Sequence, residues 1–200
     1  MTTLLDAAPK PYYERDGITG AGSAVAARAT DQSLGGGAIP TSALHIHPIP
    51  WQSGKVFVRE HHYLHTTPAG GGIALGIFAD TSLLAELVGV MLWTQPAAAN
   101  RLRDGDVSLE LRRMIILDVT TRNAESRCLG FAARYIKRVR PDIRYLLSYS
   151  DIEGMGHKGT IYKAAGWSFD GRTKPISWKN RPGRRDRGSN TTKLRWRKTL

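Results

Sequence analysis

The sequence contains very little cysteine and few acidic residues for its length. Cys128 is the only cysteine among 200 residues, so the chain cannot form an internal disulfide or a zinc site built on paired cysteines. A lone thiol fits a reducing compartment, and we expect the protein in the cytoplasm. Asp and Glu number 17 against 29 Lys and Arg, which leaves a net charge of +12.

Long hydrophobic runs are also missing. The longest apolar stretches, residues 73–79 and 83–93, are too short and too interrupted to cross a bilayer. The N-terminus has no basic start followed by an apolar run, so no secretory signal is expected. We therefore expect no membrane contact.

Basic residues are concentrated near the C-terminus. Residues 172–200 contain eleven Lys and Arg but a single acid, Asp186, and two tryptophans, Trp178 and Trp196, lie among them. Such a block attracts polyanions and releases their counterions, which favours nucleic acid as the partner. The alternative is a solvated tail that only keeps the protein soluble. The residues expected to contact DNA are Arg181, Arg184, Arg185, Arg187, Lys193, Arg195 and Arg197.

The chain divides into a leader and a folded domain. Residues 1–42 are rich in Ala, Gly, Thr and Ser without an apolar period, which predicts a flexible leader before a domain at residues 43–200. Apolar runs predict strands at residues 44–47, 73–79, 83–93, 109–119, 145–149, 167–169 and 193–197. Helical periods occur at residues 51–60, 123–139 and 160–165. The second of these helices has an apolar face of Leu129, Ala132, Ala133, Ile136 and Val139. The order predicts a mixed α/β fold.

The start of the helix at residues 123–139 is one candidate site. A helix that begins after a strand presents free backbone N–H groups, which suit a phosphate or another anion. The side chains expected to support a cofactor there are Arg122, Asn123, Ser126 and Arg127. The alternative is an ordinary capped helix.

Asp151 follows a predicted strand, at the edge where ligands of open α/β sheets usually bind. Its carboxylate suits the orientation or deprotonation of an amine, and Tyr162 and His157 are further proton donors or acceptors. The alternatives are a turn former at Asp151 and a packed aromatic at Tyr162.

Histidines and an arginine complete the candidates. The cluster at residues 61–65 offers His62 and His65, which together with His157 are candidates for a transition metal, although surface or hydrogen-bonding histidines are the alternative. Arg113, inside a strand, suits a carboxylate or phosphate, or extends harmlessly to solvent.

Several blocks in this order resemble one family. They are residues 62–65, 110–114, 122–126, 148–151 and 156–167. Over residues 45–198 the chain is similar to the Mom proteins of Mu-like phages, and Tyr162-x-x-x-Gly166-Trp167 resembles the late helix–strand motif of GNAT acyltransferases. The resemblance implies a GNAT-like, mostly antiparallel sheet flanked by helices. The chain departs from ordinary GNAT enzymes at residues 122–127, where their Arg/Gln-x-x-Gly-x-Gly/Ala loop is missing.

The resemblance also implies an activity: conversion of adenine in duplex DNA to N6-carbamoylmethyladenine, which protects phage DNA from host restriction. By matching positions, Asp151 orients the adenine amine, Tyr162 acts as general acid, Ser126 and Arg113 hold the donor, and His62 and His65 follow as catalytic candidates. The resemblance does not decide between acetyl-CoA and a glycine-derived compound as the donor. It also does not decide whether the reaction uses a transition metal.

The target amine lies inside the base pair, so the base must be extruded from the duplex. The residues expected to stack on it are Tyr63, Tyr149 or Trp167. Two other functions remain open: N-acetylation of a protein or small amine by a GNAT enzyme, and DNA binding without catalysis.

Overall fold

The computed structural model describes residues 38–80, 85–96, 107–174 and 191–200. After a short 3-10 helix at Thr41–Ala43, the strands are β1 (Leu44–Pro48), β2 (Ile73–Asp80), β3 (Ala85–Thr94), β4 (Ser108–Ile116), β5 (Tyr145–Asp151), β6 (Ser168–Arg172) and β7 (Lys193–Thr199). The helices are α2 (Trp51–His61), α3 (Ala124–Val139) and α4 (Thr160–Ala164). Every element predicted from the sequence is present within a few residues of its expected position.

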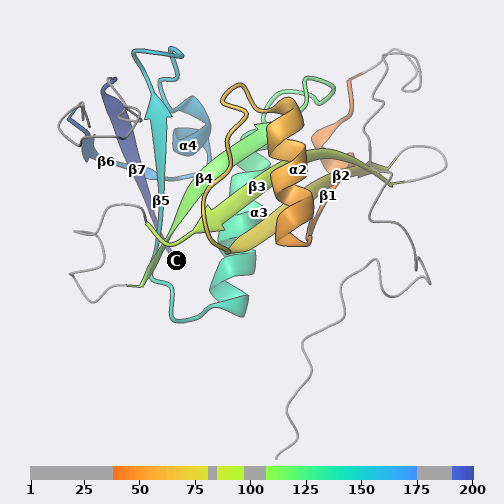
Figure 1. Cartoon of the computed structure of the whole chain (residues 1–200), viewed down its shortest axis with the longest axis horizontal. Coiled ribbons are helices and arrows are strands. Elements are labelled where there is room, and N and C mark those ends of the chain that lie inside the picture. The colour runs from red at the N-terminus through yellow and green to blue at the C-terminus, as the bar shows by residue number, and fades with distance from the viewer. Residues whose placement is uncertain (1–37, 81–84, 97–106, 175–190) are drawn as a thin grey trace, which may run out of the picture.

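The strands form one sheet in the order β1-β2-β3-β4-β5-β7-β6 (Figure 1). Strands β4 and β5 pair in parallel, and every other neighbouring pair is antiparallel. The predicted mixed fold with a mostly antiparallel sheet is therefore confirmed.

Helices cover both faces of the sheet, with α2 and α3 on opposite sides (Figure 1). α2 buries Phe57 and Val58 against Val90 and Leu92 of β3. α3 buries Leu129 and Ile136 in the larger core on the other face, as its apolar period requires. Most of the predicted apolar face of α3 is buried. Val139 is the exception and is 41% exposed, because it is the last residue of the helix.

The first described residues belong to the fold. Ile39, inside the predicted leader, is 8% exposed and packs in the larger core. Its backbone N–H donates to Val119 O (2.7 Å), and its carbonyl accepts from Thr121 N (2.8 Å). The sequence predicted a strand to residue 119, but β4 ends at Ile116. Leu117 N still donates to Val88 O of β3 (2.9 Å), and the backbone of Val119 and Thr121 then bonds with Ile39.

The end of the chain lies inside the sheet. β7 pairs with β5 on one side and with β6 on the other, so the alternating sequence of residues 193–197 forms an interior strand. Leu194 and Trp196 point into the larger core. In the described part of the chain, no helix is long and apolar enough to cross a membrane.

Candidate active site

A fork between β4 and β5 is the centre of the site. The two strands pair only over Ser108–Glu110 and Tyr145–Leu147, and then diverge toward their carboxyl ends (Figure 1). A register shift between Leu92 and Trp93 of β3 leaves Arg112 as the extra residue of a bulge in β4. The fork therefore lies at the sheet edge where α/β proteins bind ligands, with Arg113 and Asp151 on its two arms.

Tyr162 reaches this fork from α4. Its side chain is 7% exposed, and its ring stacks on Trp196 with centroids 5.8 Å apart. Ser148, on the separated part of β5, donates a hydrogen bond from Oγ to the Tyr162 hydroxyl oxygen (2.7 Å). Burial raises the pKa of Tyr162 above its usual range, so the phenol keeps its proton at neutral pH. Both interpretations of Tyr162 apply together: its ring is packed, and its hydroxyl lies at the fork.

Asp151 ends β5 and forms a turn. Its Oδ1 accepts from Gly154 N (2.8 Å), and its Oδ2 accepts from Thr191 Oγ1 (3.2 Å). A carboxylate offers about four lone-pair sites, so each oxygen retains capacity for a further donor. Asp151 therefore shapes its loop and can still accept a hydrogen bond from a substrate.

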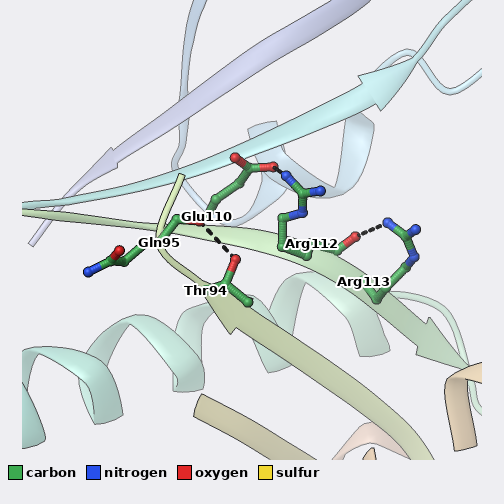
Figure 2. Close-up of polar contacts among 5 residues, drawn as sticks. All are labelled: Thr94, Gln95, Glu110, Arg112 and Arg113. Carbon is green, nitrogen blue, oxygen red and sulfur yellow. Dashed lines mark hydrogen bonds and ion pairs between the residues drawn. The ribbon is translucent and has the colours of Figure 1, made fainter. Parts of the chain in front are cut away.

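Arg113 joins β4 to the segment that follows α2. Its Nε donates to Thr66 O (2.9 Å), and its Nη2 donates to Thr66 Oγ1 (2.9 Å). Its Nη1 donates to the carbonyl of Arg112 (2.6 Å), as Figure 2 shows. We call these three contacts the Arg113 clasp. A guanidinium has five N–H groups, so two remain for a ligand.

The clasp ties Thr66 to β4, and His62 and Tyr63 lie four and three residues before it. His62 is buried, and its Nδ1 accepts a hydrogen bond from Leu64 N (3.1 Å). Burial, then the charge of Arg113, then His65 lower the pKa of His62 to about 4. His62 is therefore neutral at pH 7, with its proton on Nε2. Burial and, after it, the Asp151 carboxylate raise the pKa of Tyr63, whereas Arg113 lowers it, so this side chain lies within electrostatic reach of both arms.

The histidines do not form a metal site among the described residues. His65 Nδ1 lies 2.8 Å from Arg59 O, and the side chain of His157 is exposed. Within the described ranges, no three His, Cys, Asp or Glu side chains gather closely enough to hold a metal ion. The predicted candidates His62, His65 and His157 are therefore not brought together as three ligands.

A separate pocket of about 320 Å³ lies between the end of β4 and the start of α3. Its charged lining residues are Asp118, Arg122 and Glu125, and Asn123 also lines it. Asn123 occupies the N-cap position in the left-handed region (φ 71°), but its side chain makes no capping bond.

Only two of the four residues predicted to hold a cofactor line this pocket. Arg122 and Asn123 line it, whereas Ser126 and Arg127 do not. Ser126 Oγ instead donates to Asn123 O (3.0 Å), and Arg127 is exposed. The pocket presents two carboxylates against one guanidinium, which does not match the negative charge of a pyrophosphate.

Three of the predicted DNA-binding residues lie on β7. Side chains alternate along a strand, so Lys193, Arg195 and Arg197 face away from the core that holds Trp196. Arg195 Nε pairs with Asp170 Oδ2 (2.7 Å), and its Nη2 donates to the Asp170 carbonyl.

The guanidinium carbon of Arg197 lies 3.6 Å from the centre of the Tyr145 ring. Arg195 and Arg197 therefore have partners inside the fold. The other predicted DNA contacts lie outside the described residues: Arg181, Arg184, Arg185 and Arg187.

Three features of the site were not predicted from the sequence. Thr66 gave no signal, because its role depends on a contact with Arg113 across 47 positions. Ser148 and Glu110 were noted only within blocks of resemblance. Glu110 is buried where the fork begins and pairs with Arg112 Nη1 (2.9 Å, Figure 2). A buried acid in a strand is a weak signal, because burial itself cannot be read from one position.

Solved structures share this fold. The chain is similar to NAA60 from Arabidopsis thaliana, crystallised with acetyl-CoA, with a TM-score of 0.55 at 8% identity over 78% of this chain and 99% of that one. It is also similar to a GNAT-family acetyltransferase from Streptococcus pneumoniae, with a TM-score of 0.51 at 11% identity over 78% of this chain and 99% of that one. These likenesses show the GNAT acetyltransferase fold.

Sequence comparison identifies relatives more narrowly. The chain is 28% identical over 123 residues to the methylcarbamoylase mom of Escherichia phage Mu, across 58% of this chain and 49% of that protein. It thus spans about half the length of the curated relative that it matches. The model of the Mom protein family matches residues 43–198, from the end of the 3-10 helix to β7 and including the fork. The chain therefore belongs to the Mom protein family.

Proposed function

We propose that this protein modifies DNA, converting adenine in a duplex to N6-carbamoylmethyladenine and so protecting phage DNA from restriction in the cytoplasm of the bacterial host. The name of the phage Mu relative, a methylcarbamoylase, supports this reaction class. The observation that carries the proposal is the fork within the span matched by the family model, with Arg113 on one arm, Asp151 at the end of the other, and the Tyr162 hydroxyl bonded to Ser148 of β5.

The reaction needs a base for the amine and an acid for the leaving group. One N–C bond forms at N6, the N6 proton passes to Asp151, and the bond between the carbamoylmethyl carbon and its leaving group breaks. Tyr162 supplies a proton to that leaving group, since its burial keeps the phenol protonated. The two N–H groups of Arg113 outside the clasp hold the carboxamide of the donor.

Two donors are considered for the carbamoylmethyl group: acetyl-CoA and a glycine-derived compound. The pocket at the start of α3 does not fit a coenzyme A pyrophosphate, because Asp118 and Glu125 outnumber Arg122 among its charged lining residues. A carbamoylmethyl group is also attached through its CH₂, whereas acetyl transfer attaches a carbonyl carbon. Both points favour a glycine-derived donor over acetyl-CoA.

The basic segment, residues 172–200, is the part that we assign to the DNA backbone. Lys193 lies at the start of β7, opposite Asp151 in the register of β5 and β7. Phosphate contacts from this segment would therefore approach the arm of the fork that carries the acceptor carboxylate.

The test is mass spectrometry of nucleosides from the DNA of cells that express the protein. We expect an adenosine heavier by one carbamoylmethyl group from the wild type. The sharper variant is Asp151→Asn, because its amide oxygen can still accept from Gly154 and so preserves the turn. Asp142→Asn is the matched control, since Asp142 is an exposed acid paired with Arg140 beyond α3.

Loss of the new nucleoside in Asp151→Asn but not in Asp142→Asn supports the proposal. Unmodified adenine from a folded, expressed wild type contradicts it. Acetylation of a peptide or polyamine without DNA would support the N-acetyltransferase alternative instead. Full modification by Asp151→Asn and Tyr162→Phe would mean that the fork does not carry the chemistry.

A further inference from the structure

Two stacked rings lie beside the fork. The rings of His62 and Tyr63 have centroids 4.4 Å apart at an interplanar angle of 24°. His62 is 7% exposed, whereas Tyr63 is 51% exposed. The buried imidazole therefore supports one face of the phenol ring and leaves much of the tyrosine open to solvent.

The position of this pair is fixed from both sides. The His62 ring accepts Leu64 N–H, and the Arg113 clasp holds Thr66 three residues after Tyr63. A ring held in this way loses little conformational freedom when it binds a flat ligand. This combination of exposure and support distinguishes Tyr63 from an ordinary exposed aromatic.

The other aromatic candidates are covered. Trp167 is 5% exposed, and its ring stacks on Trp93 (6.4 Å) inside the core. Tyr162 is buried against Trp196, and Tyr149 is half-buried within β5. Of these rings in the described chain, Tyr63 is the one with a large open surface.

The surroundings of Tyr63 select a particular ligand. Arg113 donates two hydrogen bonds to Thr66, three residues after Tyr63, and Asp151 ends the other arm of the fork, so a hydrogen-bond donor and an acceptor lie on the two arms of the fork beside this ring. The charges of both groups also shift the pKa of its phenol. A flat ligand with an exocyclic amine matches this arrangement, because it can stack on the ring and donate to the carboxylate.

We propose that Tyr63 is the stacking platform for an adenine extruded from the duplex, whose N6 amine then meets Asp151. This inference rests on the proposed function and names the residue that receives the base. Extrusion breaks a base pair and its stacking, and the platform restores one stack and so lowers the cost.

Binding measurements separate the platform from phosphate contacts. The full chain is titrated into two labelled duplexes that differ at one position, where adenine faces thymine in one and an abasic site in the other. We expect the wild type to prefer the unpaired adenine. Tyr63→Ala should reduce this preference about 5- to 150-fold, the affinity change that corresponds to one base–aromatic stack.

Two variants serve as controls. Tyr63→Phe should keep the preference, since a phenyl ring still stacks. Leu64→Ala should also keep it, because Leu64 is the adjacent side chain with similar exposure (45%) but has no ring. In the fully paired duplex the base pair keeps adenine inside the helix in most of the bound molecules, so affinity for that duplex should stay nearly equal in all four proteins. This equal affinity also shows that they fold. If Tyr63→Ala does not fold, Tyr63→Leu replaces it.

An unchanged preference in Tyr63→Ala overturns the platform, and so does a wild type that does not distinguish the two duplexes. Nucleoside mass spectrometry separates this failure from that of the proposed function. If the wild type modifies adenine but binds the two duplexes with equal affinity, only the proposal about Tyr63 is refuted. If the wild type shows the Tyr63-dependent preference but leaves adenine unmodified, the proposed reaction is refuted and the proposal about Tyr63 stands.

Discussion

The Arg113 clasp gives the most quantitative prediction, through the substitution Arg113→Lys. This change keeps the positive charge but replaces a planar group with a single ammonium on a flexible stem. The guanidinium makes three hydrogen bonds, at 2.9 Å and 2.9 Å to Thr66 and at 2.6 Å to Arg112 O. A lysine at this position reaches one of these acceptors, so two bonds are lost.

The expected cost follows from that count. Hydrogen bonds near the surface contribute about 0.5–1 kcal/mol each, so Arg113→Lys should lower the free energy of unfolding by about 1–2 kcal/mol. The loss of adenine modification should be larger than this loss of stability, because the segment that carries His62 and Tyr63 is tied to β4 through Thr66. A displacement of these groups by about 1 Å can reduce the rate about 100-fold.

Urea unfolding and nucleoside analysis of the same variants test this reasoning. Thr66→Val removes only the Oγ1 contact and should show a smaller loss of stability. In a double-mutant cycle with Arg113→Lys, the coupling should be about 0.5–1 kcal/mol. Arg134→Lys is the matched control on the exposed side of α3. The reasoning is refuted if Arg113→Lys and Thr66→Val are additive, or if Arg113→Lys modifies adenine as the wild type does.

Three further predictions concern pH, packing and salt. The pKa of His62 is lowered from 6.5 to about 4, so its stabilisation is complete above pH 6.5 and is lost as the pH falls toward 4. This loss should reach about 2 kcal/mol after solvent screening, and unfolding of wild type and His62→Gln across pH 4–8 would measure it. Gly159→Ala should cost more than about 3 kcal/mol, since its Cβ would lie 2.1 Å from Trp196 at φ +76°. Gly156→Ala, at φ +67° with open space around it, should cost about 1 kcal/mol, so equal losses in urea unfolding would contradict this view. A triple neutralisation should flatten the salt dependence of duplex binding, and an unchanged slope would exclude the basic segment as the DNA contact. The residues to neutralise are Arg184, Arg185 and Arg187.

The elements of this fold were predictable because their signals are local. The apolar period of residues 123–139 located α3, and the alternation of residues 193–197 located β7. Sheet order is a long-range property, and nothing in residues 193–197 shows that they lie between β5 and β6. For the same reason Ile39 was assigned to a leader: its partner, the loop at Val119, lies 80 positions away.

The site was predictable only in part. Asp151 and Arg113 became candidates because one follows a strand and the other lies in one, and Tyr162 because it belongs to the GNAT-like helix–strand motif. Their partners were not, since Ser148, Thr66 and Thr191 are small polar residues whose roles exist only in contact. The same limit affects the predicted DNA contacts. The sequence suggested that Arg195 and Arg197 are free surface charges. In the structure Arg195 pairs with Asp170, 25 positions away, and Arg197 lies over the ring of Tyr145, 52 positions away.

Asp151 connects the chemistry to the basic segment. Thr191, which follows residues 175–190 directly in the sequence, donates to Asp151 Oδ2 (3.2 Å). Next to it, Thr192 N donates to Glu153 (2.8 Å), so the end of β5 and the turn after it accept two hydrogen bonds from the two residues just before β7. Under the proposed function, DNA held by the basic residues would act on a backbone that is tied to the carboxylate assigned to accept the amine proton. Thr191→Val removes one tie without touching a charge, and it should reduce adenine modification while leaving the salt dependence of binding unchanged. Equal modification by Thr191→Val and the wild type would show that Asp151 is positioned by its own turn alone.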